Sequence, residues 1–373
     1  MRIRPVESKA DLKAFIQFPY DHYKDDPVWV PPLRFDQRNH FNSKTNPVLE
    51  HCEYQLFLLE DAGKLVGRIA AFIDAIAADY WGEQIGLFGY YECVQNPEAA
   101  SLLLEAARDW LIDRGCTRMR GPWSFVSQEW GSVVEGFTPP PVIMGPYNPP
   151  HYNDDYAAFG LEKVKDMLCW YIASAEGYQI PERIMKLTDA VAQRYQVKIR
   201  HMDLKQYDRE VQHILDLSNS SIIGNWGYSP VTEAEGQAMA RDLKLIVQAR
   251  GVVFAEDRHG KVIGFAIALP DMNSLIKRLN GRLFPAGIFR LLFGLPRLTR
   301  YRLFGLGVAP EYQGKAIDSL IYRALYEALY TKDTWVEINY VLEDNWPMIN
   351  AIKKLNATPL RRYRVFEMGI NSV

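Results

Sequence analysis

The residues near position 314 are of types that could bind a phosphate group. The stretch Pro310-Glu311-Tyr312-Gln313-Gly314-Lys315 lies between an apolar run, 303–309, and an amphipathic pattern that continues to Tyr330. This order predicts a strand, a short turn and a helix of about four turns. Backbone N–H groups at the start of a helix lack partners within it, and together with the helix dipole they favour an anion. We therefore expect a phosphate-binding turn at Gln313, Gly314, Lys315 and Ala316.

This strand, turn and helix resemble the acyl-CoA-binding segment of the GNAT acyltransferase superfamily, where a Gln/Arg-x-x-Gly-x-Gly/Ala turn holds the coenzyme pyrophosphate. Gln313 matches that turn, whereas Ala316 replaces its first fixed glycine and Asp318 its last small residue. A carboxylate at Asp318 would repel a pyrophosphate, unless it points away or caps the helix. The alternative interpretation is an ordinary strand-to-helix turn.

The resemblance implies a co-substrate, acetyl-CoA or a longer acyl-CoA, whose pantetheine arm would lie along the strand at Leu306 and Val308. It also implies direct attack of an amine on the thioester. Such a reaction needs a group that accepts a proton from the amine, and often an acid for the leaving thiolate.

Three residues near the C-terminus are candidates for these catalytic roles. Glu337, inside the predicted strand 335–340, is the candidate base, and Tyr340 could replace the usual acid. Asn345 matches the asparagine that begins the last helix motif of the family, although the tyrosine that often serves as acid falls on Ile352. The alternatives are a glutamate on the solvent face of its strand and a tyrosine that only packs.

An internal repeat organises the whole chain. Both halves contain a hairpin with glycine in its turn, a Leu-Phe-Gly strand followed by a helix, and an Asn-x-Pro-x-x-Asn motif before a short helix; these motifs begin at 54, 87 and 148, and at 251, 303 and 345. The order predicts an α/β protein of two tandem GNAT-like units, each a mixed, mostly antiparallel sheet flanked by helices. We place the units at 1–176 and 177–373. The first has Cys93-Val94-Gln95-Asn96-Pro97 in place of the glycine turn, so we expect it to lack a coenzyme site.

Composition excludes several other classes of protein. The chain has 373 residues, a net charge of -2 and an isoelectric point of about 6.4, which does not favour nucleic-acid binding. Its four cysteines are dispersed, and no His-Glu-x-x-His motif indicates a metal site. No apolar signal core and no run of about 20 apolar residues is present. We expect a cytoplasmic protein without a metal.

Two irregular segments could contact substrates. Segment 273–302 contains seven lysines and arginines among leucines and phenylalanines, and no acid. It suits a membrane surface, a long acyl chain or coenzyme phosphates, or else forms a packed helical hairpin with a basic outer face. The second segment, 121–150, is long for a connection and rich in aromatic residues, glycine and proline. It could line a substrate pocket between the units, or form a packed surface loop; its candidate pocket residues are Trp123, Glu129, Trp130 and Asn148.

The tandem layout also resembles a bacterial group of double-GNAT proteins, some of them linked to N-acylation of long-chain amines. This resemblance implies a fatty acyl-CoA donor and a small-molecule or lipid amine acceptor. Our first hypothesis is therefore an acyl-CoA-dependent N-acyltransferase. Because the turn is altered and the usual tyrosine is missing, the second is a non-catalytic acyl-CoA or lipid-binding protein, or a structural pseudoenzyme.

Overall fold

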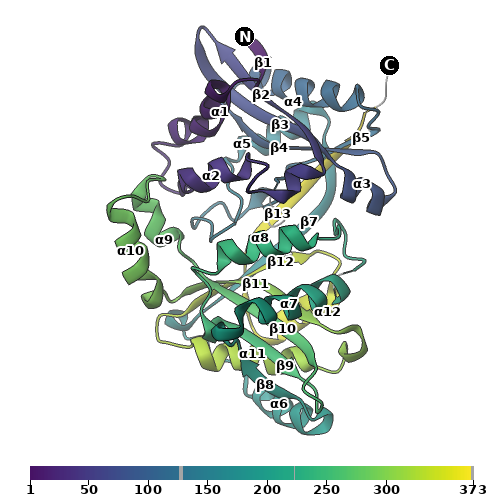
Figure 1. Cartoon of the computed structure of the whole chain (residues 1–373), viewed down its shortest axis with the longest axis vertical. Helices are drawn as coiled ribbons and strands as arrows, with labels where there is room; N and C mark the ends of the chain where they lie inside the picture. Colours follow the sequence, from purple (N-terminus) through teal and green to yellow (C-terminus); the bar gives the residue numbers. More distant parts are fainter. Residues whose placement is uncertain (126–128, 222, 371–373) are drawn as a thin grey trace. The chain divides into compact units, whose positions relative to one another are not determined.

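The computed structural model describes residues 1–125, 129–221 and 223–370, which divide into two compact units (Figure 1). Unit 1 comprises Met1–Met167, Asn273–Phe289 and Arg361–Val373, and unit 2 comprises Leu168–Met272 and Arg290–Leu360. The units are thus discontinuous in sequence, whereas the sequence predicted one boundary after residue 176. The observed division differs from the predicted boundary because β7 (Glu162–Ala173) and β13 (Thr358–Gly369) each begin in one unit and end in the other. The boundary of the sequence repeat stays a prediction.

Unit 1 is built on a mixed sheet in which only the described pair β4 and β5 is parallel. Its strands pair in the order β1-β2-β3-β4-β5-β13, and β6 also pairs with β13. The turn between β2 and β3 places Ala62 and Gly63 at φ 46° and 77°, as a tight hairpin turn requires. The strands are β1 (Arg2–Pro5), β2 (Cys52–Asp61), β3 (Lys64–Asp74), β4 (Ile85–Cys93), β5 (Arg118–Gly121) and β6 (Ser132–Glu135).

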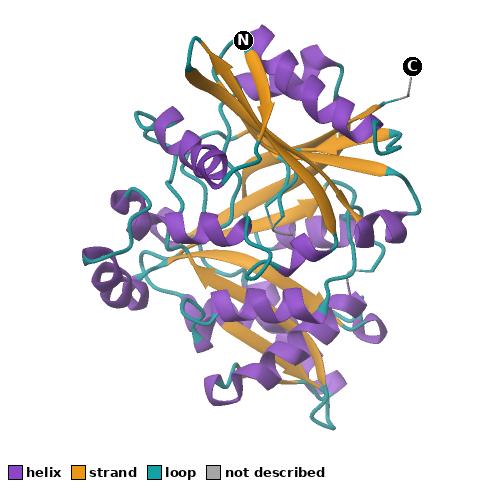
Figure 2. Cartoon of the chain, turned by 45° about the horizontal axis from the view of Figure 1, so that its top comes forward, coloured by secondary structure: helices purple, strands orange, loops and turns teal. Residues whose placement is uncertain are grey.

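Helices, drawn in purple in Figure 2, accompany the sheet in the described N-terminal part of unit 1. They are α1 (Lys9–His22), α2 (Arg34–His40), α3 (Ala75–Trp81), α4 (Pro97–Ile112) and α5 (His151–Phe159). Helix α4 packs on β2 and β3 through Leu103, Ala107 and Leu111, which recur at helical spacing. A second cluster of buried residues gathers Phe15 of α1, Phe72 of β3 and Phe125.

Unit 2 repeats the arrangement with strands in the order β12-β11-β10-β9-β8, of which only the described pair β11 and β12 is parallel. These strands are β8 (Lys198–His201), β9 (Val252–Glu256), β10 (Val262–Pro270), β11 (Arg300–Val308) and β12 (Trp335–Leu342). The helices are α6 (Glu182–Tyr195), α7 (Tyr207–Ser221), α8 (Glu233–Leu243), α11 (Ile317–Leu329) and α12 (Trp346–Lys354). Helix α11 packs on β9, β10 and α6, and α7 packs on β10 and β11.

Segment 273–302 contains two further helices, α9 (Asn273–Ile276) and α10 (Ala286–Gly294). Short 3-10 helices lie at Pro47–Glu50, Ser174–Glu176, Leu204–Gln206, Ala249–Gly251, Lys277–Leu279, Leu295–Arg297 and Pro310–Tyr312. Within the described ranges, every helix is too short or too polar to cross a bilayer.

One part of the second irregular segment was predicted wrongly. We predicted an irregular segment over 121–150, but Ser132–Glu135 forms β6, which pairs with Arg362 to Arg364 of β13. The partner lies more than 200 residues away in the chain, so no local pattern indicates the pairing. Residues 126–128 of this segment lie outside the described residues.

Candidate functional site

Two parallel strands of unit 2 part in the middle of its sheet. Strands β11 and β12 pair from Arg300 with Trp335 to Leu303 with Ile338, and β11 then continues to Val308. Along this extension β10 remains paired, with Ala266 opposite Leu306 and Gly264 opposite Val308. Beyond Leu303, the edge of β11 that faced β12 pairs with no described strand, although the Val308 carbonyl accepts a hydrogen bond from the Gln313 side chain. The predicted residues Leu306 and Val308 both lie on this stretch.

A turn with two left-handed residues follows β11. Gly314 has φ 74°, and Ala316, the residue before α11, has φ 58°. An alanine in this conformation costs about 1 kcal/mol relative to the right-handed region, and such strain is common at functional sites. No side chain caps the start of α11. The first N–H groups of this helix are thus directed to whatever lies beyond its N-terminus.

Side chains of the predicted turn fix its position. The Gln313 Nε2 donates a hydrogen bond to the carbonyl of Val308 at 3.1 Å, which ties the turn to the end of β11. The Lys315 ammonium lies 4.9 Å from the centre of the Tyr312 ring and 5.6 Å from that of Tyr195. The turn therefore combines a positive charge with the N-terminus of a helix, as an anion site requires.

Asp318 lies in the first turn of α11, directly after the predicted phosphate-binding turn. Burial raises the pKa of Asp318. No side chain caps the start of α11, so capping by Asp318, one of the two possibilities that the sequence left open, is not observed. When ionised, this carboxylate would repel a phosphate at the same end of the helix.

Glu337 belongs to a buried polar network on the paired part of β11 and β12. Its side chain is fully buried, and its Oε1 accepts a hydrogen bond from Asn339 at 2.7 Å. Asn339 Oδ1 in turn accepts one from Arg302 Nε at 3.0 Å. The alternative of a glutamate on the solvent face is therefore wrong. The guanidinium of Arg302 also lies 5.3 Å from the ring of Tyr340, so that ring is close to the same network.

Asn345 is engaged in local structure. Its side-chain oxygen accepts a hydrogen bond from the Met348 N–H at 3.2 Å and caps α12. Asn345 thus positions the last helix of unit 2. A part in the chemistry stays a prediction.

The four predicted pocket residues occur in unit 1. The Trp123 and Trp130 rings stack with centroids 4.5 Å apart. Burial and, to a smaller extent, the charge of Glu129 raise the pKa of Tyr90. Asn148 accepts from the Val133 N–H at 2.6 Å and donates to the Val133 carbonyl at 3.2 Å, which holds β6 in place.

The sequence analysis did not predict a buried polar cluster in unit 1. Glu92 at the end of β4 accepts hydrogen bonds from the hydroxyls of Tyr23 and Tyr152 and lies 3.6 Å from Arg68. Burial is the main cause that raises the pKa of Glu92, against the Arg68 charge that lowers it. His22 Nε2 lies 3.2 Å from the Tyr152 hydroxyl, and burial lowers the pKa of His22 to about 4. No motif marks these residues, because they meet only after folding.

Among the described residues, one group offers three potential metal ligands, His51, Cys52 and Asp74, with ligand atoms within 4.8 Å of one another. His51 Nδ1 lies 3.0 Å from Asp74 Oδ1, and that oxygen also caps α3 through the Ala77 N–H. Capping therefore explains the position of Asp74. The expectation of a protein without a metal stays a prediction.

Two relatives match along nearly the entire chain. Protein YghO of Escherichia coli (strain K12) is 35% identical over 378 residues, which cover 99% of this chain and 95% of the relative. The bacterial ceramide synthase of Caulobacter vibrioides (strain NA1000 / CB15N) is 32% identical over 386 residues, which cover 99% and 98%. No family model matches the chain.

Solved structures give the fold. A tandem GNAT protein from the clavulanic acid biosynthesis pathway matches over 100% of both chains with a TM-score of 0.61 and 13% identity. A GCN5-related glucosamine N-acetyltransferase region of a fungal GH3 β-N-acetylglucosaminidase matches 98% of this chain and 38% of that chain, with a TM-score of 0.57 and 13% identity. The predicted tandem GNAT fold, mixed α/β, is confirmed.

Proposed function

Because this chain belongs to the tandem GNAT-fold family that includes YghO and the bacterial ceramide synthase, we propose that it is an acyl-CoA-dependent N-acyltransferase. The acceptor would be a long-chain amine of the sphingoid type, since a ceramide synthase joins an acyl group to such an amine. The donor would be acetyl-CoA or a longer acyl-CoA in the cytoplasm, with no metal involved. Peripheral contact with a membrane through 273–302 would bring the lipid acceptor to the enzyme.

The observation that carries this proposal is the parting of β11 and β12 directly before an uncapped, left-handed turn. The N–H groups at the start of α11 and the Lys315 ammonium would bind the pyrophosphate. The open edge of β11 at Leu306 and Val308 would pair with the amides of the pantetheine arm. One continuous path thus leads from the phosphates to the point where the two strands separate.

Glu337 would receive the proton that the amine loses. The amine nitrogen attacks the thioester carbonyl carbon, the new C–N bond forms, and the C–S bond then breaks to release the thiolate of coenzyme A. A buried carboxylate close to the point of separation, reached through water, suits the general base. Tyr340 would return a proton to the thiolate, in place of the tyrosine that Ile352 replaces.

A second candidate function is a non-catalytic acyl-CoA or lipid-binding protein. Two observations favour it: the Asp318 carboxylate in the first turn of α11 would repel a phosphate there, and Asn345 serves as a helix cap. This alternative predicts coenzyme binding without turnover.

Thermal unfolding with coenzyme A, acetyl-CoA and palmitoyl-CoA tests the coenzyme site. A ligand at a hundred times its Kd adds about 2.7 kcal/mol to the free energy of unfolding, which raises Tm by about 5 °C. Gly314→Trp should abolish the rise by covering the turn. Gly260→Trp is the matched control, because Gly260 has φ 77° against 74° for Gly314 and neither has an atom within 4 Å of an added Cβ.

Turnover separates the two candidate functions. The protein is incubated with palmitoyl-CoA and a sphingoid amine, and the N-acyl product is measured by mass spectrometry. Product that depends on Gly314 supports the transferase. Coenzyme binding without product would instead favour the non-catalytic protein, and no Tm rise with any donor would contradict both.

A further inference from the structure

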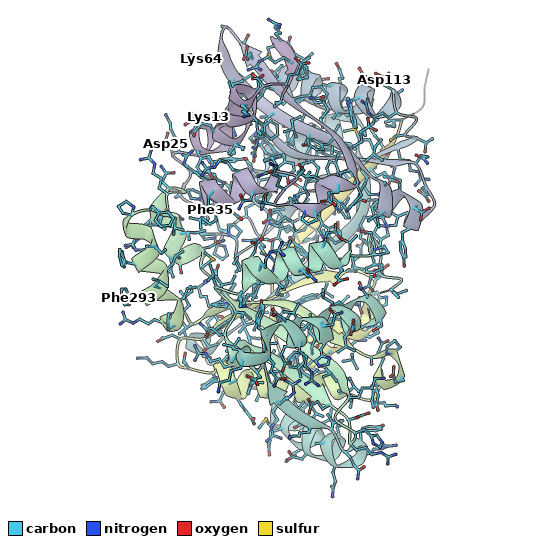
Figure 3. The ribbon with its side chains drawn as sticks, in the orientation of Figure 1. Lys13, Asp25, Phe35, Lys64, Asp113 and Phe293 are labelled. Atoms are coloured by element: carbon cyan, nitrogen blue, oxygen red, sulfur yellow. The ribbon has the colours of Figure 1, made fainter. Side chains whose placement is uncertain are left out.

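Helix α10 carries an exposed apolar face. Phe289, Leu292 and Phe293 are 60%, 61% and 68% exposed, and Phe284 just before the helix is 71% exposed. Positions 289, 292 and 293 lie on one side of a helix. Figure 3 labels Phe293 on this side. Elsewhere in the described chain, large apolar side chains of such exposure occur singly along the sequence.

The opposite side of α10 packs on the residues that precede the helix. Gly287 is buried, and a Cβ at this position would lie 2.9 Å from Leu279 Cδ1 and 3.1 Å from the Arg282 carbonyl oxygen. The preceding residues are attached as well, because the Arg34 N–H donates to the Gly281 carbonyl at 2.9 Å. The helix is thus held by one side, and its apolar side remains in solvent.

Exposed arginines flank this apolar face in the sequence. Arg278, Arg282, Arg290 and Arg297 are all exposed, and no ion pair to any of them is recorded among the described residues. The other basic residues of the segment are engaged: Lys277 donates to the Pro27 carbonyl, Arg300 pairs with Asp271 at 3.4 Å, and Arg302 is buried. No acidic residue occurs between Asp271 and Glu311.

We propose that the face of α10 formed by Phe284, Phe289, Leu292 and Phe293 docks onto an anionic lipid bilayer. An apolar strip that arginines border suits the boundary between headgroups and acyl chains, where phenylalanine enters and the guanidinium groups contact lipid phosphates. The unpaired positive charge selects this partner over a second copy of the chain, whose identical face would bring arginines against arginines. The proposal that α10 docks on a membrane depends only on this surface. The proposal that docking delivers a lipid acceptor depends also on the proposed function.

Flotation of the full-length protein with vesicles tests the docking. Vesicles of phosphatidylcholine with about 30% phosphatidylglycerol should float the protein, and pure phosphatidylcholine should float much less of it. Phe289→Ser with Phe293→Ser should lower the partition coefficient about 100-fold or more, since each lost phenylalanine removes a large buried apolar area. Arg290→Gln with Arg297→Gln should lower it about 25-fold, or about fivefold per arginine, on anionic vesicles only.

Matched controls lie outside segment 273–302. Leu204→Ser changes a residue that is 48% exposed, and Lys332→Gln removes an exposed charge; neither should alter flotation. Equal binding to neutral vesicles, or loss of binding in the controls, would overturn the proposal. So would a dimer in light scattering that the phenylalanine variants dissociate, because the face would then bind protein. Flotation needs no turnover, so it fails or succeeds independently of the acyltransferase assignment.

Discussion

The two strand-turn-helix segments, β4 to α4 in unit 1 and β11 to α11 in unit 2, occupy the same place in the repeat. They differ in whether a side chain caps the N-terminus of the helix. In unit 1 the Asn96 side chain accepts hydrogen bonds from the N–H groups of Glu98 and Ala99 at 2.9 and 3.2 Å. In unit 2 no side chain caps α11, and Gly314 and Ala316 take left-handed conformations. The first helix satisfies its own donors, whereas the second leaves them for a ligand.

The two pairs of parallel strands, β4 with β5 and β11 with β12, also differ in what lies beside them beyond the point where their pairing ends. In unit 1, β4 and β5 pair only from Ile85 to Leu87 of β4, but the chain itself follows β4 beyond that point. The Trp123 N–H donates to the Phe88 carbonyl at 2.8 Å, and a Cβ on Gly89 would lie 1.6 Å from the Trp123 carbonyl oxygen. Backbone therefore covers β4 where a pantetheine arm would lie. The first copy of the repeat thus covers this edge with its own backbone, whereas in the second β11 continues beyond its pairing with β12.

Removal of the candidate base should have the largest effect. Glu337→Gln keeps the hydrogen bond from Asn339 but cannot accept a proton, so kcat should fall about 10²–10⁴-fold. The Tm rise with acyl-CoA should persist, because the turn is unchanged. The N-acyl product is measured by mass spectrometry under saturating substrates.

The matched control is the buried carboxylate of unit 1. Glu92→Gln should lower the free energy of unfolding by about 3–5 kcal/mol, since it leaves Arg68 without its charge partner, while the folded fraction keeps its kcat. Equal kcat in wild type and Glu337→Gln would remove Glu337 from the mechanism. A loss of kcat in Glu92→Gln but not in Glu337→Gln would indicate that the general base lies in unit 1 and not in unit 2.

The polar cluster of unit 1 should also make stability depend on pH. The pKa of His22 is about 4 in the folded protein and about 6.5 when unfolded. The unfolded chain therefore binds more protons between these values, and stability is full above pH 6.5 and declines as the pH falls toward 4. The loss at pH 5 should be about 2 kcal/mol.

Urea unfolding at pH 7 and pH 5 measures this loss. His22→Gln should reduce the difference between the two pH values by about 2 kcal/mol, and replacement of the exposed His259 should not change it. A variant with the full pH dependence of the wild type would show that His22 titrates normally.

Local patterns predicted the repeat well but not the use of individual residues. The apolar spacing that continues to Tyr330 predicted α11, which spans Ile317–Leu329. The burial of Glu337 was missed because β12 is an inner strand with buried residues at successive positions, so alternation does not identify a solvent face.

The repeated Asn-x-Pro-x-x-Asn motif shows a second limit of sequence patterns. Asn345 caps α12, while Asn148, at the same place in the first copy, holds β6 through Val133. The first role is local and follows from spacing. The second depends on a strand whose partner, β13, comes from the other end of the chain.

The Asn96 cap should affect stability and not coenzyme binding. Asn96→Ala removes the acceptor for two N–H groups at the start of α4, which should cost about 1 kcal/mol and lower Tm by about 2–4 °C. Asn96→Ser should restore most of this loss. Because Trp123 covers β4, the Tm rise with coenzyme A should be equal in all three proteins, and a larger rise in Asn96→Ala would show that unit 1 still binds the coenzyme.

The smallest effect should come from Asp318, the one anion at the open helix start in unit 2. Asp318→Asn removes repulsion of a phosphate at the first turn of α11, worth about 0.3–1 kcal/mol, so the Kd for coenzyme A should fall about two- to fivefold at low salt. Burial raises the pKa of Asp318; the wild type should therefore bind more tightly as the pH falls toward that pKa, and the variant should not. Titration calorimetry measures the Kd for coenzyme A and its dependence on pH, and Asp333→Asn, which changes an exposed residue, is the control. Weaker binding by Asp318→Asn would mean that its carboxyl positions the turn for the coenzyme, and that unit 2, like unit 1, relies on a side chain at the start of its helix.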